Sequence, residues 1–244
     1  MTIGGQFYFT IYNYGMLEAR KEFDGTTPVI DLRPFFKISL WVRGVYDFVN
    51  YGNGYLIADL INDNKISPRI RNTSELLNIN YLTDLKREID SLGHYLSQGI
   101  EASSSNVFKY LMPHLDNFIK RFKGINSNSE FQFELAKWYF ENKKYSSGYI
   151  CLAECIITKI AEIYKDAGYK IGTSNKQHRD KIKNLIHNKL KINEKQSYKM
   201  LHEKFNEISL IRNAIAHAGY IEDNNRSQKR RLRVSRFKED IKNC

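Results

Sequence analysis

Three residues near the C-terminal end of the chain carry side chains suited to metal-free cleavage of a phosphodiester: Arg212, Asn213 and His217. An imidazole with an ordinary pKa of about 6.5 donates or accepts a proton near neutral pH. A guanidinium binds a phosphate through two parallel hydrogen bonds and keeps its charge. The spacing therefore suggests phosphodiester chemistry, with Arg212 stabilising charge, His217 as acid or base and Asn213 as a positioning group. The alternative is a helix-end arginine bonded to carbonyls beside a surface histidine.

The residues before this motif are typical of a helix. Apolar side chains recur there at steps of three and four residues: Leu201, Phe205, Ile208, Ile211 and Ile215. This spacing predicts a helix over residues 194–218. On a regular helix Arg212 and His217 lie about 140° apart, so one straight helix does not aim both at one atom. A two-fold interface would bring two arginines and two histidines into one cleft, and we therefore expect a homodimer.

The motif, Arg-x4-His with asparagine directly after the arginine, resembles the active-site signature of HEPN ribonucleases. Upstream segments are similar to CRISPR-associated proteins that join a CARF sensor to a HEPN domain. The segments similar to the helices before the signature are 135–139, 145–149 and 152–154, and those similar to the last part of the sensor are 14–18, 26–32, 41 and 51–53. The resemblance implies an endoribonuclease that acts on single-stranded RNA and is activated by cyclic oligoadenylate.

The sensor of this family is Rossmann-like, and the chain begins near its last third. Only two strands are expected, over residues 6–14 and 28–32. We therefore expect the ligand-reading half of the sensor to be absent. The missing half is then either a separate chain or a part lost from a truncated gene product. The other alternative is that the remaining segment serves as an accessory to the helical domain.

The rest of the sequence predicts a mainly α fold. Pro34 precedes an amphipathic segment that ends before Gly52, which is typical of a helix. Residues 62–73 are polar and contain Pro68, which indicates a linker. Helical periodicity follows over residues 74–98, 105–122, 130–142, 146–166, 176–190 and 194–218. The expected organisation is a partial CARF-like α/β segment (1–61), a linker (62–73) and a HEPN-type helical bundle (74–244).

Charge is concentrated at one end of the chain. The last eighty residues hold twenty Lys and Arg against nine Asp and Glu, and so carry the whole net charge of +11. A one-sided positive field attracts polyanions without reading their sequence. The tail residues that we expect to contact RNA phosphates are Arg226, Lys229, Arg230, Arg231 and Arg233. For the lysines over residues 176–199, a plain solvated face is an equally good interpretation.

The sequence lacks the motifs of several functional classes. His202 and Glu203 begin a zinc-protease pattern, but position 206 is Asn where a second imidazole is needed. The remaining histidines are scattered without ligand spacing, so we expect no metal ion. No apolar run is long enough to span a membrane and no export signal is visible, which predicts a cytoplasmic protein. The three cysteines, two of them at packing positions, are expected to be reduced.

The function expected from these features is metal-independent cleavage of single-stranded RNA in CRISPR-linked antiviral defence. The alternative is a module that binds RNA or mediates dimerisation, as a truncated or regulatory remnant, without cleaving. Retention of intact RNA, lost steeply as salt rises, would select this alternative.

Overall fold

The computed structural model describes residues 12–14, 29–98 and 106–217. Within these residues the chain forms nine α-helices, one short π-helix and two strands of three residues each. The elements are β1 (Tyr12–Tyr14), β2 (Val29–Asp31), α2 (Arg33–Tyr51), α3 (Tyr55–Ile61), α4 (Ile66–Asn78), α5 (Leu82–Ser97), α6 (Asn106–Phe122), α7 (Asn128–Glu141), α8 (Tyr145–Asp166), α9 (Lys176–Asn184), η1 (Leu185–Leu190) and α10 (Gln196–Ala216). The prediction of a mainly α fold is confirmed.

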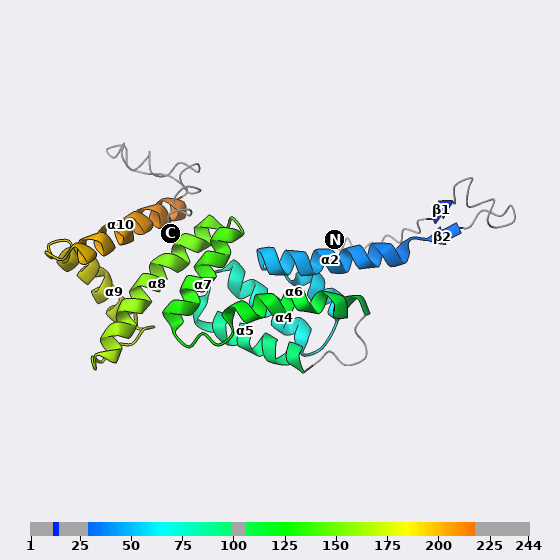
Figure 1. Ribbon diagram of the computed structural model, residues 1–244, viewed down its shortest axis with the longest axis horizontal. Helices are drawn as coiled ribbons and strands as arrows, with labels where there is room; N and C mark the ends of the chain where they lie inside the picture. The colour runs from blue at the N-terminus through cyan, green and yellow to red at the C-terminus, as the bar shows by residue number, and fades with distance from the viewer. Residues whose placement is uncertain (1–11, 15–28, 99–105, 218–244) are drawn as a thin grey trace, which may run out of the picture.

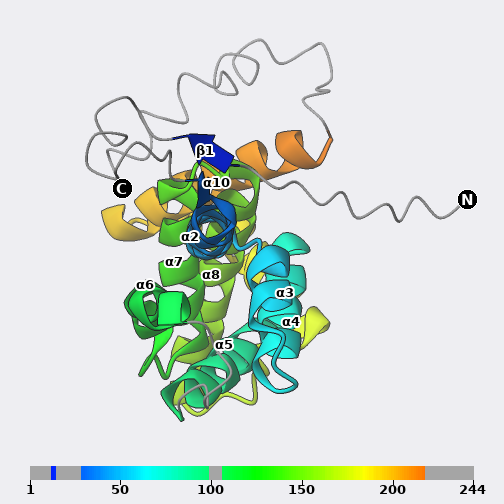
Figure 2. The same ribbon diagram turned by 90° about the vertical axis from the view of Figure 1, so that its right-hand side faces the viewer.

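The helices follow one another along an elongated molecule (Figure 1). Helices α2 to α6 form one end, the α7–α8 pair lies in the middle, and α9, η1 and α10 form the other end. Figure 2 shows α2 nearly end-on, with α6 on one side of it and α3 and α4 on the other. Helix α8 contacts both α7 and α10, so it connects the two ends.

The two strands do not form a Rossmann-like segment. β1 and β2 pair antiparallel, with Tyr12 opposite Asp31 and Tyr14 opposite Val29. A Rossmann-like sheet is parallel, and parallel neighbours need a crossover connection, usually a helix, between them. The expectation of a partial Rossmann-like unit is therefore wrong for the described residues. Residues 6–11 of the expected first strand lie outside them.

Helix α2 begins and ends as its sequence predicts. Pro34 lies in the first turn, where a missing N–H removes no helical hydrogen bond. Gly52 has a φ of 66°, and its N–H donates to the carbonyl of Phe48 at 2.8 Å. Gly54 allows α3 to meet α4, because a Cβ there would lie 2.3 Å from Cγ2 of Ile70. These two glycines thus serve turn geometry and close packing.

The segment expected to be a linker is largely helical and packed. Helix α4 begins at Ile66, and the side chains of Ile66 and Ile70 are buried. Pro68 lies in the first turn of α4, where proline is tolerated, so it does not mark a loop. The helix predicted over residues 74–98 is instead split between α4 and α5, and Asn80 in the break has a left-handed φ of 55°.

One hydrophobic core joins α2 to α7 across the predicted domain boundary. Phe48 and Tyr139 are fully buried in the same cluster. The Tyr139 hydroxyl donates to the carbonyl of Leu77 at 3.0 Å, and the Trp138 indole N–H donates to that of Val49 at 3.0 Å. Helices α2 and α3, expected to belong to a sensor remnant, therefore pack as part of the helical body.

Two cysteines of α8 are buried and not in a disulfide. The Cys151 thiol donates to the carbonyl of Gln132 at 3.1 Å, and the Cys155 thiol donates to that of Ser129 at 3.2 Å. Burial raises the pKa of Cys155 to about 11 and that of Cys151 well above its usual value. The prediction that they are reduced agrees with this geometry. Cys244 lies outside the described residues.

We expect both buried thiols to resist alkylation in the folded protein. A raised pKa leaves little thiolate at pH 8, and the thiolate is the nucleophile. In a Cys244→Ser variant, iodoacetamide should label the native chain at least about 100-fold more slowly than the urea-unfolded chain. Mass spectrometry at timed intervals would measure both rates. Equal rates would contradict the burial of these thiols.

Candidate functional site

The predicted motif lies at the end of α10, which packs on α8. Phe205 and Ile211 of α10 are buried, Phe205 in a cluster with Ile157 of α8 and Ile211 in a cluster with Tyr149 of α8. This packing confirms the predicted apolar seam. The helix ends at Ala216, and His217 follows as its cap, with its N–H donating to the carbonyl of Asn213 at 2.9 Å.

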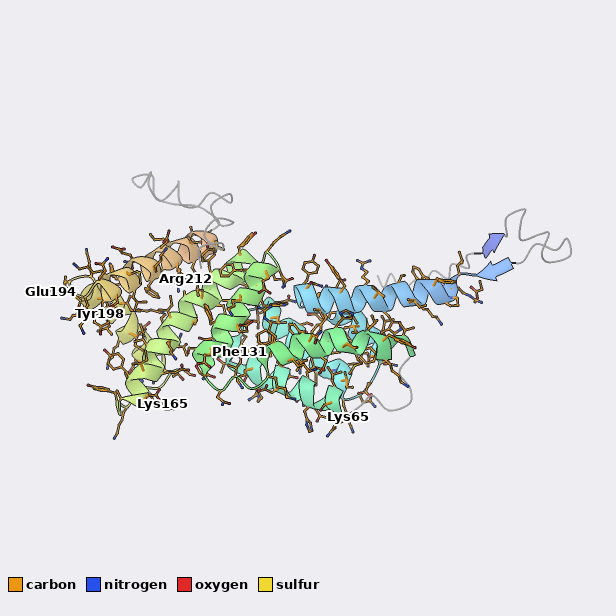
Figure 3. The ribbon with its side chains drawn as sticks, in the orientation of Figure 1. Lys65, Phe131, Lys165, Glu194, Tyr198 and Arg212 are labelled. Atoms are coloured by element: carbon orange, nitrogen blue, oxygen red, sulfur yellow. The ribbon has the colours of Figure 1, made fainter. Side chains whose placement is uncertain are left out.

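Arg212 is half-buried and its guanidinium is held in place. Nε and Nη2 donate to Oδ1 of Asn213 at 3.2 and 2.9 Å. Nη1 lies 3.7 Å from Oε1 of Glu154, which α8 contributes. Figure 3 labels Arg212 on the part of α10 that lies alongside α8. The structure thus places the side chains of Arg212 and Asn213 in contact with each other.

Glu154 also binds a second arginine. Its Oε2 accepts a hydrogen bond from Nη2 of Arg179 at 2.5 Å. Arg179 further donates to the carbonyl of Thr173 at 2.6 Å and to the hydroxyl of Thr158 at 3.1 Å. These bonds fix the carboxylate between α9 and α10. Arg212 therefore faces a carboxylate whose position is set by other contacts.

A cavity of about 310 Å³ opens beside Arg212. Its lining residues come from α9, η1 and α10, and they are Lys183, His187, Phe205, Asn206, Ser209, Leu210, Arg212 and Asn213. The ring of His187 lies 5.4 Å from that of Phe205, centroid to centroid. The Ser209 hydroxyl is buried without a hydrogen-bond partner. The lining of the cavity therefore includes a guanidinium, an imidazole, a hydroxyl without a hydrogen-bond partner, and apolar side chains.

The π-helix η1 brings His187 to this cavity. Its six residues are wound more widely than an α-helix, a geometry that often occurs at functional sites. His202 of α10 holds η1 in place, because its Nδ1 lies 2.9 Å from the carbonyl of Ile186. Asn206 in turn lies 2.8 Å from Nε2 of His202. The asparagine that ends the zinc-protease pattern thus orients an imidazole.

His217 is not part of this cavity. It is exposed beyond the end of α10 and is not among the lining residues. The structure therefore brings Arg212 and Asn213 together in one subunit and leaves His217 apart, as the angular separation on a helix predicts. The tail residues expected to contact RNA lie outside the described residues: Arg226, Lys229, Arg230, Arg231 and Arg233.

Sequence reasoning missed His187 as a site residue. The sequence predicts only a surface or satisfied core residue at this position, because nothing in its spacing links it to Arg212. Only the packing of η1 against α10 joins them. In the described part of the chain, no three His, Cys, Asp or Glu side chains gather as metal ligands do. No described helix is both long and apolar enough to cross a bilayer.

Comparison with known proteins identifies relatives of this chain. Residues 37–128 match the family model described as the second domain of CRISPR-associated protein MJ1674. The chain is 40% identical over 212 residues to the CRISPR-associated protein MJ1674 of Methanocaldococcus jannaschii. The aligned region covers 84% of this chain and 31% of that protein. The chain thus spans about a third of the relative's length. The cavity beside Arg212 lies outside the residues that the family model matches.

Proposed function

We propose that this chain is a CRISPR-associated endoribonuclease that cleaves single-stranded RNA in antiviral defence. Its similarity to CRISPR-associated protein MJ1674 supports the link to this defence. The observation that carries the proposal is the Arg212 guanidinium. Asn213 holds it beside a cavity that also contains the imidazole of His187. These are the groups that a phosphodiester transfer needs.

The proposed reaction is an internal transfer. The 2′-oxygen of a ribose forms a bond to the adjacent phosphorus, and the bond from phosphorus to the 5′-oxygen of the next nucleotide breaks. An imidazole accepts the proton of the 2′-hydroxyl, and a proton is delivered to the departing 5′-oxygen. The products are a 2′,3′-cyclic phosphate and a 5′-hydroxyl. Arg212 stabilises the negative charge that develops on the phosphoryl oxygens, and Asn213 positions its side chain.

Two imidazoles are candidates for the proton transfers. His187 lines the cavity in the same subunit. His217 belongs to the motif, and its exposure at the end of α10 leaves it accessible to a second copy of the chain. We propose a homodimer in which His217 completes the site of its partner. A cyclic oligoadenylate activator belongs to the same proposal.

The test is cleavage of an end-labelled single-stranded RNA in excess chelator. We expect cleavage to persist and to yield 2′,3′-cyclic ends. Loss of the proton-transfer group should lower the rate about 10²- to 10⁴-fold. His217→Ala should therefore be strongly impaired if the motif histidine acts, and His187→Ala if the cavity histidine acts.

His114→Ala is the matched control, since His114 is an exposed histidine on α6 away from the cavity. Wild-type rates in both His217→Ala and His187→Ala would contradict the proposal. Tight retention of uncut RNA by the wild type would instead favour the non-catalytic RNA-binding module.

A further inference from the structure

A second cavity, of about 320 Å³, lies where the helices matched by the family model meet the C-terminal helices. The turn between α4 and α5 forms one wall, the start of α7 a second, and α8 with the loop before α9 a third. It is separate from the cavity beside Arg212, because the two share no lining residue. Its size is at the lower end of the range for small-molecule sites.

The lining contains hydrogen-bonding groups that have no partner among the described residues. Both polar atoms of the Asn80 carboxamide, Oδ1 and Nδ2, are buried without a partner. Oε1 of Gln132 on α7 is also buried and unpaired. Buried polar atoms are nearly always paired, and each one left unpaired is costly. Asn80 and Gln132 both line this cavity, so a ligand bound there would supply the missing partners once these side chains rotate toward it.

The charges around the cavity are already matched within the protein. Arg179 is only 16% exposed and is bonded to Glu154, Thr158 and Thr173. Lys86 pairs with Asp90 at 3.1 Å. A strongly charged ligand would find no free countercharge among these groups. The cavity therefore suits a neutral occupant with its own donors and acceptors.

Two aromatic rings complete the lining. Phe131 is buried, whereas Tyr81 is 48% exposed at the start of α5. Figure 3 labels Phe131 in the middle of the molecule on α7. Flat aromatic side chains beside amide groups match a planar heterocycle, which stacks on rings and forms hydrogen bonds along its edge. A nucleobase is the heterocycle that has both properties.

We propose that this cavity binds a nucleobase with an exocyclic amino group beside a ring-nitrogen acceptor, the pattern of adenine and cytosine. The amino group donates to Oδ1 of Asn80, and the ring nitrogen accepts from Nδ2, as asparagine pairs with adenine elsewhere. Oε1 of Gln132 accepts the second amino hydrogen. Uracil has no amino group and does not fit. This binding goes beyond RNA cleavage and does not depend on it.

The experiment measures binding of adenosine, cytidine, uridine and guanosine to the Arg212→Ala chain by calorimetry, so that cleavage plays no part. We expect adenosine or cytidine to bind and uridine not to bind. Asn80→Gly should weaken binding about tenfold or more, since it removes two hydrogen bonds. Gln132→Met, which keeps the side-chain size, should weaken it severalfold.

The matched control is Asn62→Gly. Asn62 also follows a helix with a positive φ, of 48°, and lies outside the cavity. Glycine accepts this backbone at both positions, so both variants should fold. Binding should be unchanged in Asn62→Gly.

Competition with linear oligoadenylate, oligocytidylate and oligouridylate distinguishes the two possible sources of the base, an RNA strand or a free nucleoside. If the cavity takes a base of an RNA strand, the oligonucleotide of the preferred base displaces the nucleoside and Asn80→Gly weakens both. If it takes a free nucleoside or nucleotide, the oligonucleotide does not compete. The proposal is overturned if no nucleoside binds, if uridine binds equally well, or if Asn80→Gly and Gln132→Met leave binding unchanged.

Discussion

Replacing Arg212 with alanine is expected to lower the rate of RNA cleavage by at least about 100-fold, the effect of removing one donor to developing negative charge. The guanidinium is the group beside the cavity that can bind two phosphoryl oxygens at once. Arg212→Lys keeps the charge but loses the fork of donors, so it should restore only part of the activity. Single-turnover rates with saturating labelled RNA would measure both variants.

Arg87→Ala serves as the matched control for this loss. Arg87 lies on α5, is 77% exposed and pairs with Asp84, so it resembles Arg212 in type but not in place. The Arg87→Ala chain should cleave RNA at the wild-type rate. A fully active Arg212→Ala chain would remove the basis for placing the reaction at this cavity, even if the second cavity still binds nucleosides.

Replacing Phe48 with alanine is expected to destabilise the whole helical body by about 3 to 5 kcal/mol, the usual effect of removing a buried phenyl ring. Phe48 is fully buried, and its ring meets that of Phe118 on α6 at 5.3 Å in an edge-on arrangement. The side chain lies in the core that also contains α7. Urea unfolding followed by helical circular dichroism would measure the change in the free energy of unfolding.

Phe36→Ala provides the same substitution on the same helix. Phe36 is 60% exposed, so its removal should change the free energy of unfolding by less than about 0.5 kcal/mol. If Phe48→Ala had an equally small effect, or melted only α2, then α2 would not belong to the common core. The predicted boundary at residues 62–73 would then regain its support.

Most helices were predictable from sequence because their signals are local. The segments expected over residues 105–122 and 146–166 agree closely with α6 and α8. The break between α4 and α5 was missed, because apolar side chains continue through it at helical spacing. The left-handed backbone of Asn80 and the non-helical ψ of 85° at Tyr81 interrupt the helix there. The linker was misassigned because Pro68 at a helix start resembles a proline in a loop.

The site was predictable only where its members are neighbours in sequence. The contact of Arg212 with Asn213 involves adjacent residues, so the motif contains it. His187 and Glu154 reach Arg212 through the packing of η1 and α8 on α10, which no local pattern encodes. The strand pairing likewise depends on how the chain turns, and the sequence between the strands does not specify it.

The shared carboxylate of Glu154 leaves an imbalance between its two arginine partners. Nη2 of Arg179 lies 2.5 Å from Oε2 of Glu154, whereas Nη1 of Arg212 lies 3.7 Å from Oε1. The carboxylate therefore neutralises mainly the charge of Arg179. One unit of positive charge therefore stays on the side of α10. In the proposed reaction this excess positive charge is the countercharge for an RNA phosphate, whereas Arg179 and Lys86 at the second cavity are already paired with carboxylates.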